Sequence, residues 1–279
     1  MTTTQTLRIN GIATPVLLAG PPGGDEAVVF IHGNPGSGRD WENLAHAIAP
    51  YARVVAPDLP GFGRADKPRD FPCTVESYSA HLDALLQELG VQRVHLVLHD
   101  LGGAWGLHWG ATHAQAVASL TLINTGVLLD YRWHIAARIW QLPLVGELFQ
   151  AITTRGAFHR ALQRPGARPL PREFIDRMYG DYDAGTRRAV LKTYRAMKRP
   201  MELMQPLLPV VREVHVPVLV VWGRHDPYIP VEYAQRQREI FPQAEVVMLD
   251  SSGHWPFADD AEAVEAVVVP FMRRVVGAA

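Results

Sequence analysis

The chain lacks three features that define large classes of protein: paired cysteines, an excess of one charge and long apolar runs. Cys73 is alone among 279 residues and the 12 histidines form no zinc-ligand spacing, so neither a disulfide nor a metal is expected. A net charge of -1 gives no electrostatic reason to expect nucleic acid or a membrane as partner. No apolar run reaches the roughly 20 residues that cross a bilayer, and no signal-peptide pattern opens the chain. We therefore expect a cytoplasmic protein without metal or cofactor.

Apolar runs of strand length alternate with helix-like segments along most of the chain. The apolar runs are residues 27–32, 53–57, 94–98, 118–123, 217–222 and 245–249. Helices are expected at residues 74–90, 102–112 and 261–276. Thr74 can cap the first helix, Gly90 can end it, and Pro270 should kink the last one. This alternation predicts an α/β protein with a mostly parallel sheet and helices on both faces.

One long stretch breaks the alternation. Residues 126–213 are rich in Trp, Tyr, Arg, Leu and Pro, and the pieces 132–141 and 187–198 have helical periodicity. We expect this stretch to form a helical cap over the carboxyl edge of the sheet, where open α/β sheets bind ligands. Residues 1–125 and 214–279 would then form the core.

The segment around Asp100 is the most informative about chemistry. The strand expected at 94–98 runs into Asp100, and Gly102 and Gly103 follow it. Glycines there permit the sharp strand-to-helix turn of a nucleophile elbow, which exposes one side chain above the sheet. The simpler alternative is that Asp100 only caps the next helix, because aspartate is a favoured N-cap.

Two later loops carry possible partners for Asp100. Asp226 lies in the loop after one buried strand, and His254 lies in the loop after the next. A turn aspartate or a loop histidine is common singly, but the order of nucleophile, acid and histidine is that of α/β hydrolases. The pattern therefore favours a catalytic triad. The turn His32-Gly-Asn34-Pro stands where this fold places one loop of an oxyanion hole.

These motifs resemble one family. The turn at 32–35, the stretch His99-Asp-Leu-Gly-Gly, the Asp226 loop and Gly253-His-Trp-Pro are similar to the α/β-hydrolase branch of epoxide hydrolases and haloalkane dehalogenases. Ester hydrolases of this fold carry serine at the position of Asp100. The resemblance therefore implies an α/β-hydrolase fold with a carboxylate nucleophile.

The resemblance also implies a mechanism with two steps. The Asp100 carboxylate would displace a leaving group from an sp³ carbon and form an alkyl-enzyme ester. His254, oriented by Asp226, would then activate a water molecule that hydrolyses this ester. Backbone N–H groups of Asn34 and Leu101 would stabilise the oxyanion of the second step.

The leaving group distinguishes a halide from an epoxide. Dehalogenases that resemble this chain place Trp after the nucleophile as a halide donor, whereas this chain has Leu101. Asn34, the other common halide donor, is retained. Asn124 occupies the place where many dehalogenases carry their acid, although another group uses the later position, as here. The halide evidence is therefore divided.

The cap favours the epoxide. The stretch Thr193-Tyr194-Arg-Ala-Met-Lys-Arg199 is similar to the stretch in which soluble epoxide hydrolases carry a ring-opening tyrosine. Tyr194 would then protonate the departing oxygen; the alternative is that it packs inside the cap. No motif identifies a second tyrosine, and Tyr131, Tyr179 and Tyr182 are the candidates.

Several aromatic and motif residues are candidates for the substrate pocket. They are Asn34, His99, Tyr131, Trp133, Trp140, Tyr179 and Trp255, with His134 as a further choice. Such residues suit a small apolar organic substrate, with water as the second reactant. The aromatic residues of the cap have an alternative role in packing the cap. For the oligomeric state, a homodimer is possible.

The leading hypothesis is an epoxide hydrolase that produces a vicinal diol. A haloalkane dehalogenase, a hydrolase of an ester, lactone or natural-product intermediate, and a non-catalytic receptor on the same fold are the alternatives. Fold alone does not choose among them, but an intact triad argues against the receptor.

Overall fold

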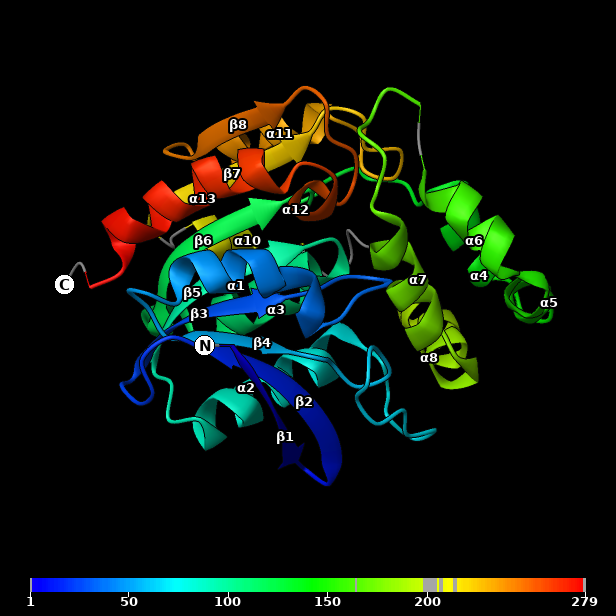
Figure 1. The fold of residues 1–279 in the computed structure, drawn as a ribbon, viewed down its shortest axis with the longest axis horizontal. Helices are drawn as coiled ribbons and strands as arrows, with labels where there is room; N and C mark the ends of the chain where they lie inside the picture. Colours follow the sequence, from blue (N-terminus) through cyan, green and yellow to red (C-terminus); the bar gives the residue numbers. More distant parts are fainter. Residues whose placement is uncertain (1, 164, 198–204, 206–207, 213–214, 278–279) are drawn as a thin grey trace.

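A twisted sheet of eight strands forms the centre of the molecule, and helices cover both of its faces (Figure 1). The computed structural model describes residues 2–163, 165–197, 205, 208–212 and 215–277. The strands are β1 (Thr3–Ile9), β2 (Ile12–Ala19), β3 (Glu26–Ile31), β4 (Val54–Pro57), β5 (Arg93–His99), β6 (Val117–Ile123), β7 (Val218–Gly223) and β8 (Glu245–Leu249).

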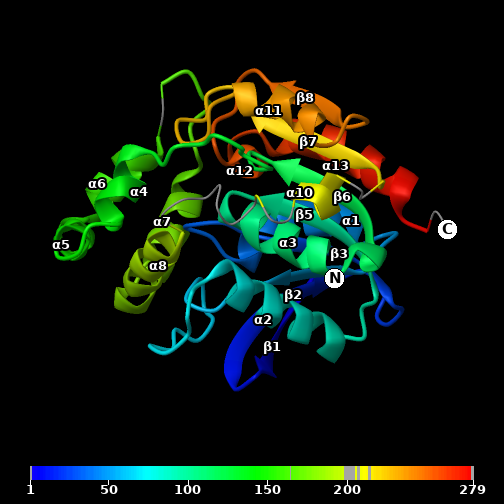
Figure 2. The same cartoon turned by 180° about the vertical axis from the view of Figure 1, so that it is seen from behind.

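The helices fall into a set that covers the sheet and a set that forms the cap. The first set is α1 (Glu42–Ile48), α2 (Val75–Glu88), α3 (Leu101–Thr112), α10 (Leu208–Arg212), α11 (Glu232–Arg236), α12 (Pro256–Asp259) and α13 (Ala261–Val275). The cap set is α4 (Ile135–Trp140), α5 (Val145–Ile152), α6 (Arg155–Leu162), α7 (Arg172–Asp181) and α8 (Ala184–Ala196). Helices α1 and α13 lie on one face of the sheet, and α2 and α3 lie on the other (Figure 2). Within the described residues, no helix is both long and apolar enough to cross a membrane.

The strand order is β1-β2-β4-β3-β5-β6-β7-β8. The pairs β1–β2 and β2–β4 are antiparallel, and the other neighbouring strands run parallel. The six strands and three helices that the sequence predicts are all present. The predicted α/β-hydrolase fold with its mostly parallel sheet is therefore confirmed.

The N-terminal hairpin was not predicted. Strands β1 and β2 pair around Asn10 and Gly11, whose φ angles are 49° and 82°. Two consecutive residues with positive φ are the requirement of a type I′ hairpin turn, and Asn-Gly is the preferred sequence for it. The signal for this hairpin was thus present in the sequence.

Local chemistry explains where α2 begins and ends. The Thr74 side chain accepts a hydrogen bond from the backbone N–H of Ser77 at 3.2 Å, and Gly90 takes a positive φ of 65° after the last turn. The predicted caps of α2 are therefore confirmed. At the other end of the chain, Pro270 lies inside α13.

The cap helices α4–α8 follow β6 and precede β7, and they stand beyond the edge toward which the parallel strands point (Figure 1). The two helical pieces predicted in this stretch correspond to α4 and α8. Lys198, the predicted end of the second piece, and the predicted cap boundary at 213–214 lie outside the described residues. Strands β6 and β7 are paired neighbours, so the chain leaves the sheet and returns to it at adjacent positions.

Candidate active site

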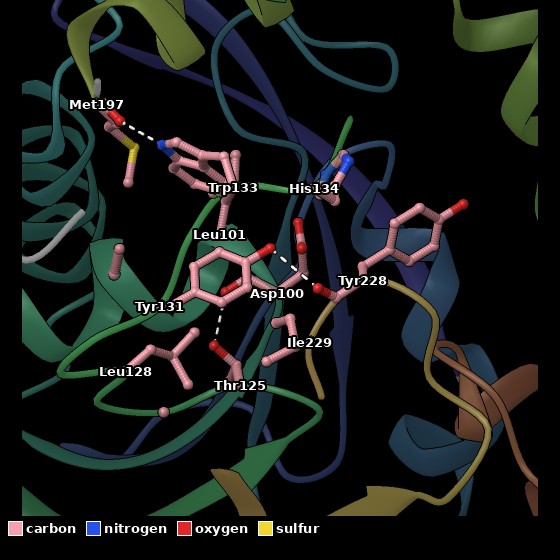
Figure 3. Close-up of a pocket in the computed structure, with 12 residues that line it drawn as sticks. Asp100, Leu101, Thr125, Leu128, Tyr131, Trp133, His134, Met197, Tyr228 and Ile229 are labelled. Atoms are coloured by element: carbon pink, nitrogen blue, oxygen red, sulfur yellow. Dashed lines mark hydrogen bonds between the residues drawn. The ribbon is translucent and has the colours of Figure 1, made fainter. Parts of the chain in front are cut away.

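Asp100 lies at the sharp turn between β5 and α3. Its φ of 49° and ψ of -125° are uncommon for a residue with a side chain. Glycines make the close approach possible: a Cβ on Gly33 would lie 2.3 Å from the Cβ of Asp100, and one on Gly102 would lie 2.4 Å from the carbonyl oxygen of Ile31. The Thr125 hydroxyl donates to the backbone carbonyl of Asp100 at 2.7 Å (Figure 3). This turn has the geometry of a nucleophile elbow.

The two oxygens of the Asp100 carboxylate have different neighbours. The backbone N–H of Asn34 donates to Oδ1 at 2.8 Å, and Nε2 of His254 lies 3.4 Å from Oδ2. Leu101 opens α3, and within the described part of the chain its N–H makes no hydrogen bond to Asp100. An oxyanion donor must be aimed at the intermediate rather than at the resting carboxylate. The role of Leu101 therefore stays a prediction.

The imidazole of His254 bridges two carboxylates. Its Nδ1 lies 2.7 Å from Oδ2 of Asp226. The other oxygen of Asp226 accepts backbone N–H groups of Tyr228 at 2.7 Å and Ile229 at 3.0 Å, which fixes its orientation. An imidazole held in this way presents Nε2 toward Asp100, as general-base catalysis requires.

Asn124 completes the support of the acid, a role that the sequence analysis missed. It is fully buried at the end of β6, and its Nδ2 donates to Oδ2 of Asp226 at 2.7 Å. Its Oδ1 accepts the backbone N–H of Gly223 at 3.0 Å. A polar residue at the carboxyl end of a strand next to β7 was the available signal. In the sequence, Asn124 stands only at the place of an alternative acid.

The charges of the triad depend on each other. Burial disfavours ionisation of Asp100, yet the hydrogen bond and charge of His254 hold the pKa of this carboxyl below its usual value. Burial likewise disfavours the imidazolium, but Asp226 and Asp100 overcome it and raise the pKa of His254 to about 10. At neutral pH the resting site therefore holds a protonated His254 next to an ionised Asp100.

Asp100 lies where two cavities meet. The larger has a volume of about 160 Å³ and is lined by triad residues, by Asn34 and Trp255, and by cap residues of α4–α8 that include Trp140, Tyr182 and Tyr194. The smaller, of about 50 Å³, is lined by Asp100, Leu101, Tyr131 and Trp133 among others (Figure 3). His134 and Tyr228 line both. The site is thus enclosed between the sheet edge and the cap.

Tyr194 extends from α8 into the larger cavity. Its side chain is 2% exposed, and its hydroxyl accepts a hydrogen bond from Nδ2 of Asn34 at 3.4 Å. Its ring packs against Trp133 and Trp140 at centroid distances of 4.9 Å. Burial, and then the nearby charge of Asp100, raise the pKa of Tyr194 well above its usual value. The hydroxyl is therefore protonated at neutral pH and shares a cavity with the carboxylate; Arg199, the last residue of its motif, lies outside the described residues.

The other candidate tyrosines differ in position. The Tyr131 hydroxyl donates to the backbone carbonyl of Tyr228 at 3.0 Å (Figure 3). Tyr182 lines the larger cavity, and burial raises its pKa to about 12. Tyr179 lines neither cavity; its ring packs 5.4 Å from that of Phe158, so its proposed contact with substrate is corrected to a packing role.

His99 requires a similar correction. It is buried beneath the triad, with Nε2 2.8 Å from the backbone carbonyl oxygen of His254, and it lines neither cavity. Its ring packs against those of Phe257 and Trp41, at centroid distances of 4.9 Å and 6.3 Å. Burial lowers the pKa of His99 to about 3, so it is neutral. His99 supports the His254 loop from below rather than touching a substrate.

Comparison with known proteins agrees with this geometry. The family model described as alpha/beta hydrolase fold matches residues 26–261. The chain is 31% identical, over 95% of its length and 93% of the relative, to a cis-3-alkyl-4-alkyloxetan-2-one decarboxylase of Xanthomonas campestris pv. campestris. It is 30% identical, over 68% of its length and 58% of the relative, to a haloalkane dehalogenase of Mesorhizobium japonicum. The structure of the epoxide hydrolase VrEH1 from Vigna radiata has a TM-score of 0.81 at 20% identity, with 98% of each chain covered.

The fold, the elbow and the matched family model define an enzyme of the α/β-hydrolase class. The chain belongs to the α/β-hydrolase fold family. Within the described residues, no three side chains of the kinds that bind metals gather in one place.

Proposed function

We propose that this enzyme opens an epoxide to a vicinal diol through a covalent ester on Asp100. The observation that carries the proposal is the position of Tyr194, whose buried hydroxyl shares one enclosed cavity with Asp100 and His254. A departing epoxide oxygen needs a proton, and a protonated hydroxyl next to the nucleophile can supply it.

In the first step, Oδ2 of Asp100 attacks one ring carbon while the bond from that carbon to the ring oxygen breaks. The oxygen takes the proton of Tyr194, and the His254 imidazolium returns a proton to the tyrosinate through solvent. Asp100 needs no base for this attack, because it is already ionised. The step leaves an alkyl-enzyme ester and a neutral imidazole.

In the second step, neutral His254 removes a proton from water, which attacks the carbonyl carbon of the Asp100 ester. Esterification has removed one of the two charges that raise the pKa of His254, so the imidazole is a competent base at this stage. The N–H of Asn34 donates to the oxyanion that forms on Oδ1. On collapse of this intermediate the diol oxygen leaves and takes the proton from His254. The Asp100 carboxyl group that remains passes its own proton to His254, which restores the resting carboxylate and imidazolium.

The test separates the two steps. A His254→Gln variant should still be alkylated but should not release product, so an ester should accumulate on Asp100. Intact-protein and peptide mass spectrometry should show a gain equal to the whole mass of the epoxide on the Asp100 peptide. An adduct on any serine, or none with an epoxide that the wild type converts, would mean that the nucleophile is misassigned.

A second candidate is the opening of a four-membered lactone, favoured by the 31% identity to an oxetan-2-one decarboxylase along nearly the whole chain. Asp100 would attack the sp³ ring carbon that is bonded to the ring oxygen. The lactone carboxylate would then be the leaving group, and it needs no proton. Loss of carbon dioxide would then form a carbon–carbon double bond and release Asp100. This route needs no water, so His254→Gln should spare it, and its products should be an alkene and carbon dioxide.

The same experiment identifies a halide substrate. Trp140 and Trp255 line the larger cavity, and their buried indole N–H groups have no hydrogen-bond partner among the described residues. Release of bromide from a bromoalkane would show that the substrate is a haloalkane and not an epoxide. The His254→Gln variant should then gain the mass of the substrate minus that of hydrogen bromide. A panel of epoxides, oxetan-2-ones and bromoalkanes therefore separates the three chemistries.

A further inference from the structure

The large hydrophobic side chains that are exposed in the described structure all lie in one short stretch of the cap. They are Ile135, Leu142, Leu144, Val145, Leu148 and Ile152, which we call the cap patch, with exposed fractions from 49% to 82%. Scattered single exposed hydrophobic residues are normal, whereas a contiguous exposed group marks an interaction surface.

The cap patch spans α4, α5 and the turn between them. Ile135 opens α4, and Leu142 and Leu144 lie in the turn. In α5, Val145, Leu148 and Ile152 follow at intervals of three and four residues. Helix α5 lies at the outer end of the cap in both views (Figures 1 and 2). The side chains of the cap patch are exposed to solvent there.

The segment that carries the cap patch also borders the substrate cavity. Phe149 and Gln150 of α5, and Thr153 just after this helix, line the larger cavity. One helix thus separates a cavity for an apolar substrate from an apolar outer surface. An apolar substrate would be concentrated in a lipid phase rather than in water.

The charge around the cap patch is positive. Residues 132–163 contain four arginines and one glutamate, in a chain whose net charge is -1. The glutamate, Glu147, is paired with Arg195 at 2.7 Å. Arg132, Arg138 and Arg160 are exposed and have no acidic partner within the described part of the chain. Arg138 follows Ile135 by three residues, so the two share a face of α4.

We propose that the cap patch docks the enzyme on an anionic lipid surface. An apolar face flanked by arginines is the arrangement of helices that lie in a membrane interface without crossing it. Charge favours a lipid surface over a second copy of the chain. In a two-fold symmetric dimer, the unpaired arginines of both copies would lie near one another and repel. This local positive region is not evident from the net charge of -1, because acidic residues elsewhere in the chain balance it.

Vesicle flotation tests the proposal with the full chain. The wild type should float with vesicles of equal parts phosphatidylcholine and phosphatidylglycerol, and much less with phosphatidylcholine alone. Leu148→Gln/Ile152→Gln should lower the partition coefficient by at least about tenfold, because two apolar side chains no longer leave water. Arg138→Glu should lower it on the order of tenfold for the anionic vesicles, because two units of charge change.

Arg8→Glu is the matched control. Arg8 is exposed on β1, far from the cap in both views, and the same charge change there should leave flotation unchanged. Wild-type protein that stays in the buffer, or binding that survives the double substitution, overturns the proposal. A solution dimer that Leu148→Gln/Ile152→Gln dissociates also overturns it, because the patch would then be a subunit interface. Unchanged circular-dichroism melting of the variants confirms that they fold.

Discussion

The two halves of the cap are attached to the molecule in different ways. The half made of α7 and α8 is bound to the core by ion pairs: Arg177 with Asp40 at 2.8 Å, and Lys67 with Asp183 at 2.7 Å. Helices α4 and α5 bind instead to α8, through the Glu147–Arg195 pair and a hydrogen bond from the Gln141 side chain to the Tyr194 carbonyl.

This difference matches what each half contributes to the site. The half fixed on the core carries Tyr194, whose hydroxyl needs an accurate position relative to Asp100. The half that rests on it contributes apolar walls such as Phe149 and, on its outer side, the cap patch. Atoms that react need accurate positions, whereas walls that select a substrate tolerate variation. We therefore expect α7 and α8 to serve chemistry and α4 and α5 to serve access.

The largest effect should come from Tyr194. Tyr194→Phe removes the proton donor while keeping the ring, so alkylation by an epoxide should slow by about 10²–10⁴-fold. Hydrolysis of the ester should change little, because it uses His254. Rapid-mixing kinetics would measure both steps.

Phe149→Ala, in the other half of the cap, is the comparison variant. It should raise KM for bulky epoxides and leave kcat close to that of the wild type. An unchanged alkylation rate in Tyr194→Phe would remove this residue from the chemistry. A large loss of kcat in Phe149→Ala would contradict the division between the two halves.

An intermediate effect should come from the ion pair that attaches α7. The Asp40 side chain is 1% exposed, and burial raises its pKa even though Arg177 opposes the rise. Arg177→Met should therefore leave a buried carboxyl without its partner and lower the free energy of unfolding by about 3 kcal/mol. Denaturant titration monitored by circular dichroism measures this loss.

Glu147→Gln breaks the corresponding pair of the other half. Because this pair is exposed to solvent, the substitution should not change the unfolding midpoint measurably. If Arg177→Met and Glu147→Gln lowered the free energy of unfolding equally, the two halves of the cap would not be attached differently.

The smallest effect should be a pH dependence that comes from the core and not from the cap. The pKa of Tyr194 is raised well above 10, so this group does not titrate in the working range. Hydrolysis of the ester needs neutral His254, so its rate should rise with pH, while alkylation should stay flat through neutral pH. Pre-steady-state rates across pH would show this; a flat second step would exclude His254 as the base.

The same histidine links pH to stability. Its pKa is raised from 6.5 to about 10, so its contribution to stability is complete below 6.5 and is lost as pH rises toward 10. In His254→Gln this decline in unfolding free energy should disappear. Denaturant titrations of both proteins over this range would measure it.

Local patterns in the sequence were sufficient for the fold and for the positions of the candidate site residues after its strands. Strand-length runs and the residues just after them depend on short-range chemistry, so Asp100, Asp226 and His254 could be placed at strand ends. Which side chains meet across the cap depends on packing between distant segments. Residue type alone therefore assigned His99 and Tyr179 to the pocket, although one lies beneath the triad and the other packs on Phe158.

Asn124 illustrates a different limit. Its amide is useful because β6 and β7 are neighbours, which brings Asp226 within 2.7 Å of its Nδ2. The sequence shows that both residues follow strands, but not which group each side chain meets. Strand pairing is a long-range contact, and its consequences for hydrogen bonding appear only in three dimensions.

The pairing of β6 with β7 also bears on how such an enzyme diversifies. Because the cap leaves one strand and returns at the strand beside it, its length can change without altering the register of any other pair. Gene exchange or laboratory grafting of this segment would replace the substrate-facing surface of the cap, Tyr194 included, while Asp100, Asp226 and His254 stay on the core. A lineage can therefore change both the compounds that it admits and the group that meets the departing atom, while it keeps the same nucleophile and histidine.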